Sequence, residues 1–175
     1  MSKKNKKTMN LQKAKAVYES LNAVQRGELL TDLITLYNQK RDPQTLMPVM
    51  QCLMDNVAVG VPMRVSEEDM KMIQAAKASQ EKIPTRISMK TVVLRTPEGV
   101  NYLPVFSRRG EVPQEFFEKY YWIQMPFKEC AKLVKSMEQV DQIIINTFTQ
   151  RLILPEQTLD GITLVDGLRP AEENK

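Results

Sequence analysis

The segment between Val100 and Leu154 constrains the fold more than any other part of the chain, because strand and helix patterns alternate in it. Its order is strand, helix, strand, helix and hairpin. Two further strands are predicted at Val57–Met63 and Arg86–Arg95. We therefore expect an α/β fold with α+β packing, in which helices pack on a mixed sheet of five or six strands after one or two N-terminal helices.

Two helices are predicted before the first strand. Apolar residues recur at helical spacing from Leu11 to Leu21. Asn22 and Gln25 then have the spacing of a capping box, which predicts that a second helix begins there. Gly27 is expected to weaken this second helix by about 1 kcal/mol relative to alanine. The apolar face of the helix comprises Leu29, Leu30, Leu33, Ile34 and Tyr37.

The next helix has two candidate starts. Asp42 followed by Pro43 is a strong local signal, but this start places Pro48 in the helix interior, where proline costs about 3 kcal/mol. A start at Thr45 places Pro48 in the first turn, where its missing N–H is harmless. We favour Thr45 as the N-cap.

Three features indicate how the strands pair. Pro62 predicts that the strand Val57–Met63 either lies at a sheet edge or stops pairing at that point. Thr96–Gly99 has proline and glycine at positions that a hairpin turn favours, so it should connect the two strands that flank it. A final hairpin is predicted between Asp141–Asn146 and Arg151–Leu154.

The chain has no histidine among its 175 residues, and this excludes many kinds of site. Ser-His-Asp and Cys-His catalysis need the imidazole, as do zinc sites that contain histidine. Cys52 and Cys130 lie in separate helical segments, so we expect two buried thiols and neither a metal site nor a redox pair. The sequence predicts no cofactor and no metal, and it does not favour an enzyme.

The net charge of +4 comes from the N-terminus. Without Lys3, Lys4, Lys6 and Lys7, basic and acidic residues balance, so the charge does not favour a nucleic-acid partner. No apolar run approaches the roughly 20 residues of a membrane span. No apolar segment follows the lysines either, so we expect no membrane insertion, no secretory leader and a cytoplasmic location.

Two neighbouring segments are candidates for binding. The loop Ser107–Gly110 follows a strand and precedes a helix, so Arg108 and Arg109 are either solvated or hold an anion. The aromatic residues Phe116, Phe117, Tyr120, Tyr121 and Trp122 form either a core corner or a protein-binding surface. In the second case Tyr121 and Trp122, which point to opposite faces of a strand, join the two arginines as candidate binding residues.

Three pieces of this pattern carry a resemblance to a known family. They are the strand Tyr102–Phe106 ending on Ser107, the start of a short helix at Pro126 and Phe127, and the hairpin that begins with the strand through Asn146. With them, residues 44–165 resemble the SseB N-terminal domain, the enhanced serine sensitivity family of bacteria. The other expected parts are a disordered basic arm (1–9), an N-terminal helical extension (10–43) and a flexible tail (166–175).

The resemblance implies a fold more than a reaction. We expect a non-catalytic bacterial protein that acts through protein–protein contacts, with a tie to amino-acid (serine) metabolism implied by the family. The partner is an unknown protein, and a second copy of the chain is one candidate. The alternative is a small-molecule or anion-binding sensor, or an enzyme, that uses the loop of Arg108 and Arg109.

Overall fold

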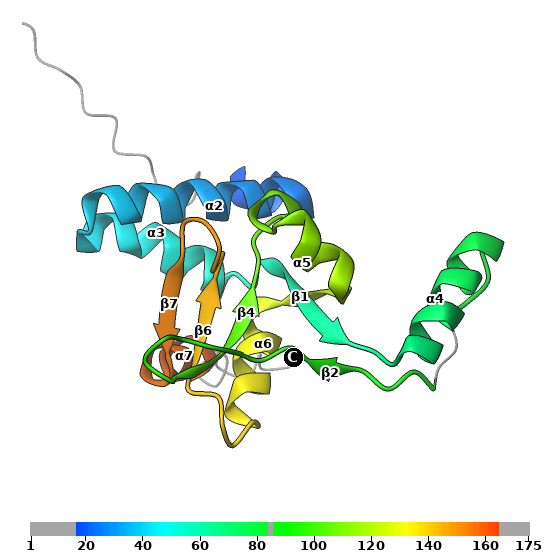
Figure 1. The fold of residues 1–175 in the computed structure, drawn as a ribbon. Coiled ribbons are helices and arrows are strands. Elements are labelled where there is room, and N and C mark those ends of the chain that lie inside the picture. The colour runs from blue at the N-terminus through cyan, green and yellow to red at the C-terminus, as the bar shows by residue number, and fades with distance from the viewer. Residues whose placement is uncertain (1–16, 84–85, 165–175) are drawn as a thin grey trace, which may run out of the picture.

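The computed structural model describes residues 17–83 and 86–164, and Figure 1 shows their arrangement. The expected basic arm (1–9), the tail (166–175) and most of the first predicted helix lie outside the described residues. In order, the elements are α2 (Ala23–Lys40), α3 (Pro43–Met54), β1 (Ala58–Arg64), α4 (Glu67–Ser79), β2 (Lys90–Thr91), β3 (Leu94–Arg95), β4 (Asn101–Val105), the 3-10 helix η1 (Arg109–Glu111), α5 (Gln114–Lys119), β5 (Tyr121–Pro126), α6 (Phe127–Lys135), β6 (Gln142–Ile145), β7 (Leu152–Pro155) and α7 (Glu156–Leu164).

The strands form two sheets, which corrects the expected single sheet of five or six strands. One sheet has three strands in the order β2-β1-β5, and the other has four in the order β3-β4-β6-β7. All neighbours pair antiparallel except β4 and β6, which are parallel. The sheets meet at Gly60 and Phe106, whose backbones exchange two N–H···O bonds of 2.7 and 2.9 Å.

The separation into two sheets arises at one edge of β1. The other edge pairs with β5 from Ala58 to Met63. The edge of β1 that faces away from β5 has two partners. Gly60 pairs with Phe106 at the end of β4, whereas Met63 and Arg64 pair with β2. The predicted strand Arg86–Arg95 is therefore divided into β2 on one sheet and β3 on the other.

Pro62 marks the place where pairing with β2 stops, as one of the two sequence interpretations predicted. Its carbonyl accepts a hydrogen bond of 3.1 Å from the Val92 N–H, and the ladder to β2 begins only at the next residue. The missing N–H of Pro62 points toward this incomplete edge, where no donor is needed. The strand can therefore lie inside the sheet, paired on both sides.

The main core lies between the four-stranded sheet, β1 and the helices α2, α3, α6 and α7. One sheet face supplies alternate residues of β4, β6 and β7, as the two-residue period of a strand requires. In α2, Leu30 and Ile34 are fully buried, which confirms the predicted apolar face. The six residues that β4, β6 and β7 contribute to this core are Leu103, Val105, Ile143, Ile145, Leu152 and Leu154.

The predicted capping box of α2 is present. The Asn22 carboxamide accepts from the Gln25 N–H and the Gln25 side chain accepts from the Asn22 N–H, both at 2.9 Å. The predicted hairpins are present as well. In the first, Gly99 has a φ of 92° in the turn between β3 and β4, and in the second, β6 pairs with β7.

The start of α3 differs from the favoured sequence interpretation. The helix begins at Pro43 with Asp42 as its N-cap, not at Thr45, and Pro48 lies inside it. The Asp42 carboxylate accepts from the Thr45 N–H at 2.8 Å, and the Thr45 hydroxyl donates to the Asp42 carbonyl at 3.0 Å. Pro48 is exposed, so water can reach the carbonyl one turn earlier that loses its helical donor.

The cap of α3 gives a first prediction. Asp42→Ala is expected to lower the free energy of unfolding by about 1 kcal/mol, because the Thr45 N–H loses its acceptor. Asp42→Asn retains a side-chain oxygen and should cost much less. Urea unfolding followed by circular dichroism measures both changes, and equal losses for the two variants would contradict the capping role.

Candidate functional site

The carboxyl ends of β4 and β6 place two polar residues side by side. The strands are parallel, so Ser107 after β4 and Asn146 after β6 lie at the same edge of the sheet. Both are buried, with exposed fractions of 7% and 0%. The Asn146 carboxamide oxygen accepts from the Ser107 N–H at 2.9 Å, and its Nδ2 donates to the Ser107 hydroxyl at 2.9 Å. Ligands of α/β sheets commonly bind at this edge.

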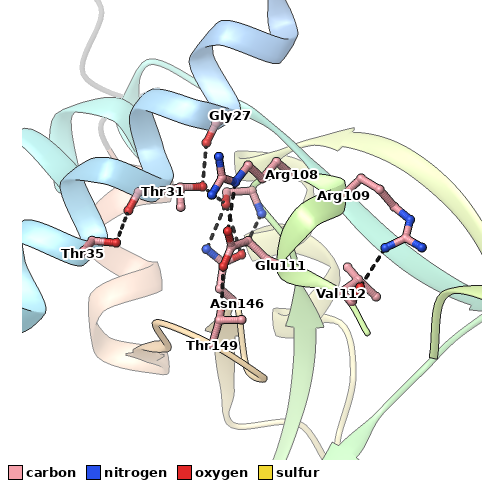
Figure 2. Close-up of polar contacts among 10 residues, drawn as sticks. Gly27, Thr31, Thr35, Arg108, Arg109, Glu111, Val112, Asn146 and Thr149 are labelled. Carbon is pink, nitrogen blue, oxygen red and sulfur yellow. Dashed lines mark hydrogen bonds and ion pairs between the residues drawn. The ribbon is translucent and has the colours of Figure 1, made fainter. Parts of the chain in front are cut away.

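Helix α2 closes this edge. The Thr31 hydroxyl donates to the Gly27 carbonyl at 3.0 Å, and a hydrogen bond of 2.5 Å joins it to the Ser107 hydroxyl. A chain of hydrogen bonds thus runs from Asn146 through Ser107 and Thr31 to the α2 backbone (Figure 2). Because every member has a partner, the network attaches the helix to the strand ends.

Gly27 allows this close approach. A Cβ atom at position 27 would lie 2.2 Å from the carbonyl oxygen of Ser107, far inside van der Waals contact. The sequence interpretation treated Gly27 as a weakness of the helix. In the structure, the absent side chain is what lets α2 rest directly on the backbone at the end of β4.

Asn146 also suits its backbone conformation. Its φ of 53° lies in the left-handed region, where asparagine is much more common than most residues. Its N–H donates to the Val105 carbonyl at 2.9 Å, which extends the parallel pairing by one bond. The turn therefore directs the Asn146 side chain back under Ser107.

The two candidate arginines point to different neighbours of their own chain (Figure 2). The Nε of Arg108 binds the carboxylate of Glu111 at 2.9 Å, and Glu111 is only 5% exposed. The Thr149 hydroxyl donates to the other oxygen of this carboxylate. Arg108 thus supplies the counter-charge of a buried acid, and Glu111 links η1 with the loop between β6 and β7.

Arg109 turns toward the aromatic residues instead. Its NH1 donates to the Val112 carbonyl at 2.7 Å, and its NH2 donates to Gln114. The guanidinium carbon lies 3.8 Å from the centre of the Phe117 ring, a cation–π contact. Both guanidinium groups are thus engaged by groups of their own chain.

Six rings form the aromatic cluster, a term used below for Phe106, Phe116, Phe117, Tyr120, Trp122 and Phe148. Phe106 lies at its centre with 1% exposure, and its ring lies 5.4 Å from that of Trp122. Phe148 stacks on Phe106 at 5.8 Å and meets Phe116 at 4.9 Å, yet it remains 44% exposed. The other four rings are half-buried, so the cluster has a buried centre and a partly exposed rim.

The four predicted binding residues do not converge on one place. Trp122 stacks on Phe117 at 5.2 Å and donates its indole N–H to the Phe117 carbonyl at 2.9 Å, so Phe117 connects it with Arg109. Tyr121 packs against the main core, and Lys77 of α4 lies 5.0 Å from the centre of its ring. Tyr121 and Trp122 therefore lie on opposite faces of β5, as the strand pattern predicted.

Sequence reasoning missed Phe148 and the polar network. Ser107 and Asn146 each lie at the end of a predicted strand in the sequence. That pair was the available signal, because two polar residues directly after parallel strands lie together. Phe148 gave no such signal, since its place in a short loop says nothing about distant aromatic residues.

The cysteines are free and buried, as expected. Burial raises the pKa of the Cys52 thiol to about 11 and that of Cys130 to about 12, so both stay protonated at neutral pH. Within residues 17–83 and 86–164, no group of three acidic or cysteine side chains could hold a metal ion. No helix in these residues is both long enough and apolar enough to cross a membrane.

A comparison with protein families identifies the family of this chain. The family described as the SseB protein N-terminal domain matches residues 30–159. The chain belongs to this family. No curated protein and no solved structure matches the chain. The region matched to SseB begins within α2 and includes Thr31, Ser107 and Asn146, whereas Gly27 lies outside it.

Proposed function

We propose that this SseB domain is a non-catalytic protein that binds a protein partner through the rim of the aromatic cluster. The observation that carries the proposal is the exposure of Phe148, which is 44% exposed although it stacks on buried Phe106. Large aromatic side chains and arginine are the commonest energetic anchors of protein interfaces. Phe116 contacts Phe148 directly, and Trp122 is linked to it through Phe106. Phe117 and Arg109 extend the cluster beyond Trp122.

The state of the strand ends supports binding at a surface. The edge at which an α/β sheet commonly holds a ligand is filled by α2, and the polar groups there bind one another. The alternative, an anion or small-molecule site at Arg108 and Arg109, finds less support. Arg108 is engaged with Glu111, and Arg109 with Val112 and Phe117.

The proposal extends to the location of the protein and to its metabolic role. We infer a cytoplasmic protein, in keeping with its two free cysteines. The SseB family supports a link to amino-acid metabolism, and a partner that acts on serine or a related amino acid would agree with it. The partner itself would be identified by experiment.

The test compares two exposed apolar side chains of similar exposure. Phe148 is 44% exposed and belongs to the cluster, whereas Ile153 of β7 is 46% exposed and lies outside it. A partner isolated from the native host with the full chain is titrated against wild type, Phe148→Ala and Ile153→Ala. Phe148→Ala should weaken binding by about 2 kcal/mol or more, roughly 30-fold, because an anchor is lost.

Two further variants show whether the loss of affinity is specific to the cluster. Ile153→Ala should change the affinity by less than about twofold, in the range of ordinary surface substitutions. Arg109→Ala should fall between the two variants, since the guanidinium stacks on the cluster. A partner that binds wild type and Phe148→Ala equally would contradict the proposal.

A further inference from the structure

Strand β5 is an edge strand of the three-stranded sheet. It contains six residues, Tyr121–Pro126, and among residues 17–83 and 86–164 its only strand partner is β1. Natural edge strands are usually short, bulged, or interrupted by charged residues or proline, which prevents pairing with another chain. From Tyr121 to Met125, β5 has none of these features. Its free edge therefore resembles an interface more than a protected boundary.

The direction of the free backbone groups follows from β1. Gly60 exchanges both of its backbone bonds with Phe106, and the Pro62 carbonyl accepts from Val92, so these residues face away from β5. Val59, Val61 and Met63 must then face β5, where they lie opposite Met125, Ile123 and Tyr121.

In β5, the intervening residues Trp122 and Gln124 therefore direct N–H and C=O outward. Among the described residues, no backbone bond outside the strand ladders involves either of them. The free edge thus presents two donors and two acceptors at a two-residue spacing, which is the pattern that an added antiparallel strand pairs with.

We propose that β5 pairs with β5 of a second copy of this chain, antiparallel and centred on Ile123. In this register Trp122 of each copy exchanges N–H···O bonds with Gln124 of the other. All the outward groups of these two residues then have partners, and a two-fold axis relates the two copies. The pairing joins the two three-stranded sheets into one continuous sheet.

The side chains favour a second copy over an unrelated strand. Tyr121–Pro126 contains no charged residue, so two copies meet without repulsion along the strand. On one face, Tyr121 lies opposite Met125 of the other copy, a favourable sulfur–aromatic pair. Ile123 meets its own counterpart at the axis. The sequence is thus complementary to itself in this register.

One variant removes the pairing and spares the fold. Gln124→Pro deletes an outward N–H, and edge strands tolerate proline at such a position. Because two hydrogen bonds per dimer are lost, the dissociation constant measured by sedimentation of the full chain should rise roughly 30-fold. Gln124→Ala keeps the N–H and should stay within about threefold of wild type. The melting temperature of each variant shows that the fold persists.

A cross-link tests the register independently. Ile123→Cys places two thiols across the axis, at a distance that suits a disulfide, and air oxidation with copper as catalyst should yield a covalent dimer. The native thiols are buried and should not react. Met125→Cys is the matched control, because its counterpart lies about 13 Å away along the strand.

The outcomes separate this inference from the proposed function, because the register does not involve the exposed ring of Phe148. Dimers of wild type, weakened by Gln124→Pro and cross-linked only at position 123, support the pairing. A wild-type chain that stays monomeric up to its highest soluble concentration overturns it. A dimer that Gln124→Pro leaves unchanged, or one that cross-links equally at 123 and 125, overturns it too.

Discussion

Gly27→Ala is expected to destabilise the protein by more than about 2 kcal/mol, although this change usually strengthens a helix by up to about 1 kcal/mol. The added Cβ would lie 2.2 Å from the Ser107 carbonyl oxygen. Helix α2 would have to move away, which would break the 2.5 Å hydrogen bond between Thr31 and Ser107 and loosen Leu30 and Ile34 in the core. Chemical unfolding at equilibrium measures the change in the free energy of unfolding.

The chain contains a matched control for this prediction. Gly161 lies in α7, and no atom of the described residues that could contact it lies within 4 Å of the position of its missing Cβ. Gly161→Ala should therefore stabilise the protein by up to about 1 kcal/mol, the ordinary helix effect. The two substitutions should have opposite signs. If both were stabilising, α2 would not rest on the end of β4.

Ile145→Ala should lower the free energy of unfolding by about 2–5 kcal/mol, because it leaves a cavity in the centre of the main core. Ile145 has 0% exposure, and it lies in β6 opposite Val105 of β4 and Leu152 of β7. Ile153→Ala, in the same hairpin but 46% exposed, should cost less than about 0.5 kcal/mol. Equal effects at the two positions would mean that β6 does not line the core.

Sequence reasoning predicted local features well, because their signals lie within a few residues. The capping box at Asn22 and Gln25, the turn at Thr96–Gly99 and the hairpin of β6 and β7 are all present. The start of α3 differs from the favoured prediction, because the Asp42 cap outweighs the penalty of a proline inside the helix. In the structure the cap prevails, and the proline lies on an exposed side.

Long-range features were not accessible in the same way. The division into two sheets depends on the pairing of Gly60 with Phe106, and no local pattern indicates that contact. The role of Gly27 depends on Ser107, 80 positions away along the chain. For the site, the aromatic segment and the arginine loop were found, but the engagement of Arg108 with Glu111 and the place of Phe148 required coordinates.

The side chains at the strand ends bind one another, whereas the aromatic rim is partly exposed. The polar residues at the strand ends attach α2, while the ring of Phe148 remains at the surface. We propose that a partner covers this ring, because burial of its apolar surface would be favourable. The central claim is therefore that the rim around Phe148 is a contact surface for another protein.

Photo-crosslinking from position 148 tests this claim most directly, since it captures a partner whose identity is not yet known. A photoreactive phenylalanine analogue replaces Phe148 in cells of the native host, and the same analogue at Ile153 serves as the control. We predict a discrete cross-linked protein at position 148 that is absent at position 153, and its yield should fall when Arg109→Ala is added. The same cross-links from both positions, or none from position 148, would contradict the claim.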